Sequence, residues 1–125
     1  MNLLLDTHAL LWWLVDDPTL SEKARAHIFD GNNLVFVSAA VVWEIQIKQS
    51  LAKLIIPPDF HRVLDRQPFE FLAMTVEHAF AVGDLPLIHR DPFDRMLIAQ
   101  AKTEGFTIIT RDSLFNKYKV PIIKA

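Results

Sequence analysis

The 125-residue sequence contains no cysteine. That absence excludes disulfide bonds, zinc sites built from thiolates and cysteine nucleophiles. Glycine is also scarce, with only 3 residues, and 51% of the chain is hydrophobic, which is not the composition of a disordered or low-complexity protein. We therefore expect a single domain over residues 1–125 that is long enough to bury a substantial core.

A membrane-spanning stretch is missing as well. No uncharged apolar run approaches the roughly 20 residues that a spanning helix requires. The N-terminal segment MNLLLDTHALLWWLV is rich in apolar residues, but it has no basic residue at its start, and Asp6 and His8 interrupt it. Secretory signal sequences have a different pattern. The sequence thus predicts a soluble, cytoplasmic protein that does not associate with a membrane.

The net charge of −2 gives no reason by itself to expect a nucleic-acid partner. The charge is unevenly distributed, however. Residues 1–88 contain 6 Lys and Arg against 11 Asp and Glu, whereas residues 89–125 contain 7 against 4, a local excess of 3 positive charges. Such a region is suited to a phosphate backbone, but it is equally typical of an ordinary solvated surface.

Short apolar runs alternate with segments of helical periodicity along the chain. Strands are predicted at Leu3–Leu5, Leu34–Val37, Phe69–Leu72, Thr107–Ile109 and Ile122–Ile123. Helices are predicted at 7–15, 21–29, 39–50, 59–66, 76–82 and 92–104. This alternation predicts an α/β fold, with a central parallel sheet of four to five strands between two layers of helices. The helix at 7–15 is apolar on every face, which indicates cover either from the helix at 21–29 or from a second copy in a homodimer.

The segment HRDPFDRMLIAQA, residues 89–101, places two acids at the start of a predicted helix. Asp91 suits the N-cap, Pro92 suits the first helical position, and Asp94 in the first turn meets the positive end of the helix dipole. Capping alone accounts for both acids. A functional role therefore depends on the rest of the chain.

Four carboxylates are predicted at one edge of the sheet. Asp6 follows the first strand and Asp112 the fourth, while Glu44 and Asp94 lie near the starts of the helices at 39–50 and 92–104. Ligands of open parallel sheets bind at this edge, beyond the carboxyl ends of the strands. Capping or solvent exposure explains each acid singly. Together they would repel one another and lose hydration, so they stay ionised only if a cation joins them.

The predicted ligands are all oxygen atoms, which favours Mg²⁺ or Mn²⁺ over zinc and suits phosphoryl chemistry. Thr7 and Thr110 place hydroxyl groups beside the acids, where they can orient a carboxylate or cap a helix. Four basic residues flank two of the acids: His89, Arg90, Arg95 and Arg111. They are expected either to contact a phosphate backbone or to form ion pairs with the neighbouring acids.

Four motifs in series carry a family resemblance: LLLDTHALLWWL, VSAAVVWEIQIK, HRDPFDRMLIAQA and IITRD. Over nearly the whole chain they resemble the PIN-domain ribonucleases, and specifically the VapC-type toxins of bacterial type II toxin–antitoxin systems. The resemblance implies a PIN-like fold and a Mg²⁺- or Mn²⁺-dependent endoribonuclease that cleaves structured RNA such as tRNA with a metal-activated water. It also implies a homodimer and inhibition by a VapB-like antitoxin.

Carried over by residue, the acidic quartet of the family falls on Asp6, Glu44, Asp94 and Asp112, with the supporting hydroxyl on Thr110. Contacts to RNA are expected from Thr7, His89, Arg90, Arg95 and Arg111. Asp91 competes with Asp94 for the third acid, and we choose Asp94 because Asp91 is used as the helix cap. Ala52 stands where relatives often carry glycine, so the turn after the helix at 39–50 is expected to differ.

One alternative from another functional class stays open at this stage. The acids would only cap helices, and the protein would be a catalytically silent PIN-like binding module that sequesters a protein partner. This alternative predicts no stabilisation by Mg²⁺. The nuclease hypothesis predicts the reverse, because a cation that relieves carboxylate repulsion stabilises the folded state.

Overall fold

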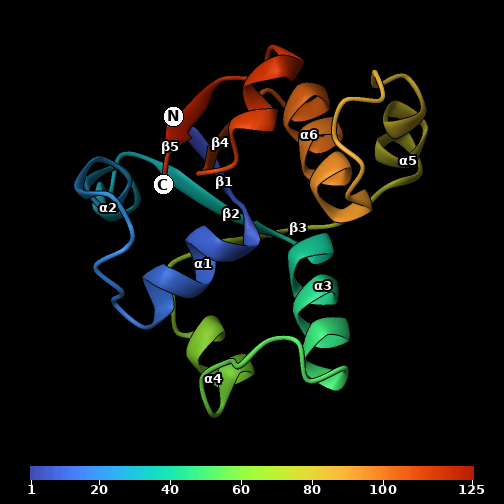
Figure 1. Ribbon diagram of the computed structural model, residues 1–125. Helices are drawn as coiled ribbons and strands as arrows, with labels where there is room; N and C mark the ends of the chain where they lie inside the picture. Colours follow the sequence, from blue (N-terminus) through green and yellow to red (C-terminus); the bar gives the residue numbers. More distant parts are fainter.

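A computed structural model describes residues 1–125 as a five-stranded sheet with helices on both faces (Figure 1). The strands are β1 (Asn2–Leu5), β2 (Leu34–Ser38), β3 (Glu70–Leu72), β4 (Thr107–Thr110) and β5 (Ile122–Lys124). Every neighbouring pair is parallel, in the order β3-β2-β1-β4-β5. The predicted α/β/α sandwich is confirmed, with five strands in its sheet.

The helices form two layers. The α-helices are α1 (Thr7–Leu14), α2 (Glu22–Phe29), α3 (Ala39–Ser50), α4 (Phe60–Asp65), α5 (Val76–Gly83) and α6 (Pro92–Glu104). Figure 1 shows α1 to α4 on one side of the sheet and α5 and α6 on the other, as right-handed crossovers in this strand order require. None of these helices is both long and apolar enough to cross a membrane.

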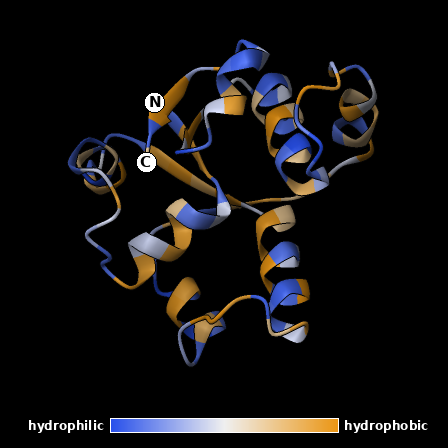
Figure 2. Ribbon diagram, in the orientation of Figure 1, coloured by the Kyte–Doolittle hydropathy of each residue, from blue (hydrophilic) through white to orange (hydrophobic).

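The core lies on both faces of the central strands. Leu3, Leu4 and Leu5 of β1 are completely buried, as are Ile108 and Ile109 of β4 beside them. Strands covered on both faces have continuous apolar runs instead of alternating ones, which is why these segments could be recognised in the sequence. Figure 2 shows hydrophobic residues along β2 and mixed residues along α3 and α6, each of which has a face outside the core.

The strand order reverses between β1 and β4. The chain passes from β1 to β2 and β3 in one direction, and then places β4 and β5 on the other side of β1. Such a switch point leaves a crevice at the carboxyl ends of the two strands. Leu5 pairs with Ile109 there, and the backbone N–H of Asp6 donates to the Ile109 carbonyl at 3.2 Å. Asp6 and Thr110 are thereby brought to the same point.

Two features depart from the expectations. A 3-10 helix, η1 (Ser113–Tyr118), follows β4 and was not predicted. Helix α1 is also covered by a segment that was not expected to contact it. The Trp13 indole N–H donates to Gln67 Oε1 at 3.0 Å, and the Trp13 ring packs against Phe69, both in the segment after α4. Leu11 of the same helix is only 9% exposed. Part of the cover of α1 therefore comes from the segment after α4, which neither predicted alternative included.

The turn after α3 contains Ala52, at the position where relatives often carry glycine. Ala52 has a φ of +55°, in the left-handed region that glycine adopts at no steric cost. The turn therefore keeps the backbone conformation that glycine would favour. The expectation that this turn differs from that of relatives stays a prediction, and the alanine carries a conformational cost that glycine would not.

Candidate active site

A cavity of about 430 Å³ opens at the carboxyl ends of β1 and β4. We call it the acidic cavity. Its lining residues are Asp6, Thr7, His8, Trp12, Glu44, Lys48, Asp91, Asp94, Arg111 and Asp112. All four predicted acids are therefore together, and Asp91 lies beside them. Among the other residues predicted for the site, Thr7 and Arg111 line this cavity, whereas Arg90 and Arg95 do not.

Asp6 is the N-cap of α1 and is 7% exposed. One of its oxygens, Oδ1, accepts the Ala9 N–H at 2.9 Å. Burial raises the pKa of the Asp6 carboxyl, although hydrogen bonds from the Thr110 hydroxyl and the Ala9 amide oppose that rise. Thr110 itself is 1% exposed. The predicted hydroxyl therefore lies where it supports the ionised form of Asp6.

Glu44 reaches the cavity from the second turn of α3 and is 4% exposed. Its Oε1 accepts a hydrogen bond from the Thr7 hydroxyl, and its Oε2 lies 2.5 Å from Lys48 Nζ. Ala40 and Val41 of the same helix are each 1% exposed, so this part of α3 is packed into the fold. The Thr7 hydroxyl therefore orients a carboxylate of the site, as was expected of it, and its contact to RNA stays a prediction.

Helix α6 begins as the sequence predicted. Asp91 is its N-cap and accepts the Asp94 N–H at 2.9 Å, and Pro92 occupies the first position. The Asp94 side chain is 21% exposed. Burial raises the pKa of the Asp94 carboxyl to about 8, with further contributions from the charges of Asp91 and Glu44. The cavity therefore holds more negative charge than its own cations offset.

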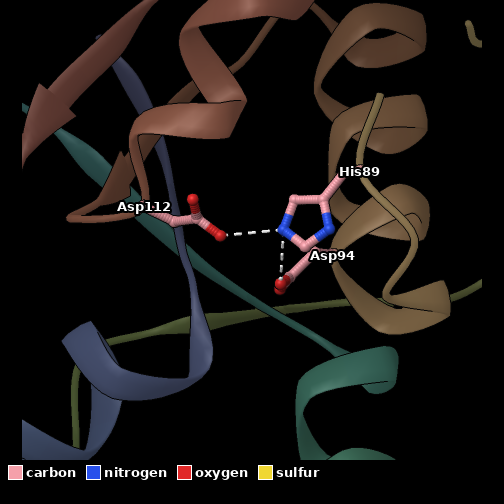
Figure 3. A group of neighbouring side chains, drawn as sticks. All are labelled: His89, Asp94 and Asp112. Atoms are coloured by element: carbon pink, nitrogen blue, oxygen red, sulfur yellow. Dashed lines mark hydrogen bonds and ion pairs between the residues drawn. The ribbon is translucent and has the colours of Figure 1, made fainter. Parts of the chain in front are cut away.

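His89 joins Asp94 and Asp112, as Figure 3 shows. Its Nε2 lies 2.8 Å from Asp112 Oδ2 and 3.1 Å from Asp94 Oδ2. Asp112 lies two residues after the end of β4, and its Oδ1 accepts the Leu114 N–H at 2.9 Å as the cap of η1. His89 is 7% exposed. An interaction of His89 with a neighbouring acid was one of its two expected roles, and it is present. That one ring nitrogen joins both Asp94 and Asp112 was not predicted.

Arg95 does not form the ion pair that was one of its two expected roles, and its contact to RNA stays a prediction. Its guanidinium donates to the carbonyls of Pro86 at 3.0 Å, Val82 at 3.1 Å, His89 at 3.2 Å and Leu85 at 3.4 Å. It forms no ion pair with an acid. Arg95 therefore fastens the segment between α5 and α6 onto α6.

Arg90 and Arg111 remain exposed. Arg90 makes no side-chain hydrogen bond and lines a second cavity, whose walls are mostly hydrophobic. Arg111 lies over the Trp12 ring, with 4.8 Å from its Cζ to the ring centre. Its guanidinium also donates to the carbonyls of Thr19 and Ala125. The cations that line the acidic cavity are therefore Arg111 and Lys48, and the sequence had assigned no role to Lys48.

The donor set fits a hard divalent cation. Asp6, Glu44, Asp94 and Asp112 supply only carboxylate oxygens, the ligands that Mg²⁺ and Mn²⁺ prefer. Burial, and after it the charges of neighbouring acids, raises the pKa of Asp94 to about 8, and a bound cation would favour its ionised form. These four residues are the ones that could hold the ion.

Comparison with known proteins identifies the family. The family model of the PIN domain matches residues 3–121. The chain belongs to the PIN domain family. This PIN domain is 26% identical over 134 residues to Ribonuclease VapC22 from Mycobacterium tuberculosis (strain ATCC 25618 / H37Rv), an alignment that covers 96% of this chain and 94% of the relative. The resemblance to VapC-type PIN domains inferred from the motifs is confirmed.

Solved structures share the same PIN fold. VapBC2 from Rickettsia felis, bound to a DNA fragment from its promoter, matches with a TM-score of 0.72 and 14% identity over 98% of each chain. DNA-bound VapBC from Salmonella typhimurium matches with a TM-score of 0.68 and 18% identity, over 98% of this chain and 97% of the other. FitAcB from Neisseria gonorrhoeae matches with 0.67 and 21%, over 98% and 96%. At these identities the likeness is one of fold.

Proposed function

We propose that this PIN domain is a divalent-metal-dependent endoribonuclease, the toxin of a VapBC-like toxin–antitoxin system. The observation that carries the proposal is the convergence of four carboxylates in one cavity, where Asp94 has a pKa of about 8. Carboxylates that served only as helix caps would not have to lie together in one cavity. The similarity to Ribonuclease VapC22 supports the same activity.

In this proposal Asp6, Glu44 and Asp94 hold a Mg²⁺ or Mn²⁺ ion, and Asp112 completes its shell or orients a water. A divalent cation supplies Lewis acidity, which polarises a phosphate oxygen and lowers the pKa of a water. The chain's own hydroxyls set the geometry: Thr7 orients Glu44, and the Thr110 hydrogen bond favours the charged form of Asp6. Hydrolysis then leaves 5′-phosphate and 3′-hydroxyl ends.

Structured RNA such as tRNA is the proposed substrate, entering beside Trp12 and Arg111. Trp12 is half-buried and is the one hydrophobic side chain that lines the acidic cavity. The Arg111 guanidinium stacks on the Trp12 ring, and the centre of the His8 ring lies 5.7 Å from the centre of the Trp12 ring. Aromatic and guanidinium planes stack on unpaired bases whatever their identity. Trp12→Ala should therefore weaken RNA binding without removing metal binding, and unchanged RNA affinity would contradict this placement.

The proposed partners in the cytoplasm are a VapB-like antitoxin and a second copy of the chain. The structural neighbours named VapBC support the antitoxin. For the homodimer we propose the apolar surface around Trp43, which is 55% exposed and lines two hydrophobic cavities of about 520 and 560 Å³ between α3 and its neighbours. Trp43→Glu should give a monomer by analytical ultracentrifugation, whereas Phe29→Glu on the distant α2 should not. An unchanged dimer in Trp43→Glu would exclude this surface.

Thermal melting of the purified protein tests the metal site before a substrate is known. We expect Mg²⁺ and Mn²⁺ to raise the melting temperature relative to EDTA, because they bind the folded state only. Asp94→Asn should melt higher than the unsubstituted protein in EDTA and gain less from metal. Asp84→Asn, at an exposed aspartate whose side chain forms no hydrogen bond, is the matched control. Equal melting with and without metal would instead favour the silent binding module.

A further inference from the structure

The environment of His89 fixes which ring nitrogen carries hydrogen. The backbone N–H of Asp91 points at His89 Nδ1 at 3.2 Å. A backbone amide can only donate, so Nδ1 must present its lone pair, and the hydrogen of the neutral ring is then on Nε2. This Nε2 faces Oδ2 of both Asp112 and Asp94, at 2.8 and 3.1 Å. His89 is therefore oriented as a donor shared by two carboxylates.

The backbone around His89 is held from several directions. The Tyr118 hydroxyl accepts the N–H groups of His89 at 2.6 Å and of Ile88 at 3.1 Å, and donates to the Pro86 carbonyl at 2.9 Å. Arg95 donates to the His89 carbonyl at 3.2 Å. The edge of the His89 ring meets Phe115, with ring centres 5.6 Å apart. These contacts keep the ring in the orientation that Asp91 selects.

The two carboxylates that His89 joins come from different elements. Asp94 is in the first turn of α6, whereas Asp112 lies between β4 and η1. His89 Nε2 contacts Oδ2 of each carboxylate, whereas Oδ1 of Asp94 accepts no hydrogen bond from the protein. Such a contact both fixes the rotation of the Asp94 carboxylate and limits the distance between two groups that repel each other.

We propose that His89 is a positioning residue of the acidic site, which uses its Nε2–H to hold Asp94 and Asp112 and is not itself a metal ligand. The competing possibility is that one ring nitrogen and the two carboxylates ligate an ion together, since these atoms lie within 4.8 Å of one another. Ligation through Nε2 would require its lone pair and a hydrogen on Nδ1. The Asp91 amide opposes that arrangement. The effect of His89 on metal affinity rests on the proposed function, but its tautomer does not.

Long-range ¹H–¹⁵N correlation spectra of histidine-labelled, metal-free protein read the tautomer directly, with the His89 signals assigned from their loss in His89→Gln. We expect Nε2 to be protonated and Nδ1 to be bare, and Nε2 to keep its hydrogen when Mg²⁺ is added. A hydrogen on Nδ1, or its loss from Nε2 on adding Mg²⁺, would overturn the proposal. Because the first reading needs no metal, it decides the tautomer even if Mg²⁺ does not bind.

Two substitutions separate a donor at Nε2 from simple filling of space. The amide of His89→Gln reaches about as far as Nε2, whereas that of His89→Asn reaches only as far as Nδ1. We expect His89→Asn to weaken Mg²⁺ binding by about 10- to 100-fold in calorimetry, as loss of a group that orients a ligand does, and His89→Gln to lose less than about 10-fold. His61→Gln, whose side chain is 91% exposed and meets only Asp65, is the control and should bind as the unsubstituted protein does.

Equal losses in His89→Gln and His89→Asn would overturn the positioning role, as would the absence of loss in both. Spectra that show intact folds for both variants exclude general unfolding as the cause of a weaker affinity. A protein that binds Mg²⁺ normally but cleaves no RNA would contradict the proposed nuclease while leaving the role of His89 intact. The two claims can therefore fail separately.

Discussion

Lys48 Nζ lies 2.5 Å from Glu44 Oε2, one turn further along α3. The hydrogen bond to Glu44 raises the pKa of the Lys48 ammonium against the opposing effect of its partial burial, and the charges of Glu44, Asp91 and Asp94 add to the rise. Lys48 is therefore a built-in counter-charge of the acidic cavity. It offsets one negative charge of the cavity, and the remaining excess is what a bound cation would neutralise.

Replacing Lys48 by Met should destabilise the metal-free protein. The expected cost is about 1–2 kcal/mol, because Glu44 keeps its burial and loses a charged partner, while the one-third exposure of Lys48 limits the effect. Saturating Mg²⁺ should restore more stability to this variant than to the unsubstituted protein. Urea denaturation with and without Mg²⁺ measures both quantities. Lys53→Met, at an exposed lysine without an ion pair, is the control, and equal unfolding of the two variants would contradict the role of Lys48.

The metal-free protein should lose stability as the pH rises from about 4 to about 8. The pKa of Asp94 is raised from 3.8 to about 8 in the folded state, so over this window the folded chain holds a proton that the unfolded chain has released. The free energy of unfolding then falls with pH, by at most about 1.4 kcal/mol per pH unit from this one group. The raised pKa of Asp6 acts in the same direction.

Asp94→Asn should flatten that decline, since the amide cannot release a proton, and saturating Mg²⁺ should reduce it in the unsubstituted protein. Chemical denaturation in EDTA across the pH range is the measurement. A metal-free stability that is level or rising between pH 4 and 8, and identical in Asp94→Asn, would show that Asp94 is not held in the environment described here.

Arg95→Lys should loosen the segment between α5 and α6, because a lysine cannot reproduce the several carbonyl contacts of the guanidinium. We expect a loss of about 2 kcal/mol in the free energy of unfolding and faster amide exchange at Ile88 and His89. Arg90→Lys, at an exposed arginine without side-chain hydrogen bonds, should change neither. If Arg95→Lys weakened RNA binding alone and left exchange unchanged, Arg95 would be a substrate contact after all.

Ala52→Gly should stabilise the protein by about 1 kcal/mol, since Ala52 has a φ of +55° that glycine adopts without steric cost. Ala79→Gly, in the middle of α5, should lose about as much through its lower helix propensity. Guanidinium denaturation measures the free energy of unfolding of both variants, which we expect to rise in Ala52→Gly and to fall in Ala79→Gly. A loss of stability in Ala52→Gly would mean that the turn after α3 is not left-handed in solution.

The sequence predicted the sheet and the bounds of α3 and α6 well for a physical reason. The central strands β1 and β4 are buried on both faces, which makes them continuous apolar runs, and Ser38 and Asp91 mark the starts of the two helices as N-caps. The predicted gathering of the acids followed from the strands being parallel, which places their carboxyl ends at one edge. Helix η1 was missed because a 3-10 helix has three residues per turn and does not show the 3.6-residue periodicity of an α-helix.

The contacts that tune the site were less accessible from sequence. The spacing of Glu44 and Lys48 by four residues on one helix was a local signal that could have been used. The position of His89 beside the acids predicted a contact to one of them, but not that a single ring nitrogen joins two, and the hydrogen bonds of Arg95 and Tyr118 offered no signal. They depend on how the segment before α6 folds, and Tyr118 meets it from about 30 residues away in the chain. Local patterns do not encode contacts of that kind.

The most direct test of the central claim is cleavage of a total tRNA pool by the purified protein, free of any antitoxin. The reaction is run in Mg²⁺ or Mn²⁺, in EDTA, and with Asp94→Asn in metal, with Asp84→Asn as the control. The account predicts discrete fragments with 5′-phosphate ends in metal for the unsubstituted protein and for Asp84→Asn, and none in EDTA or with Asp94→Asn. Cleavage that persists in EDTA, or that Asp94→Asn performs equally well, would contradict a nuclease built on these carboxylates.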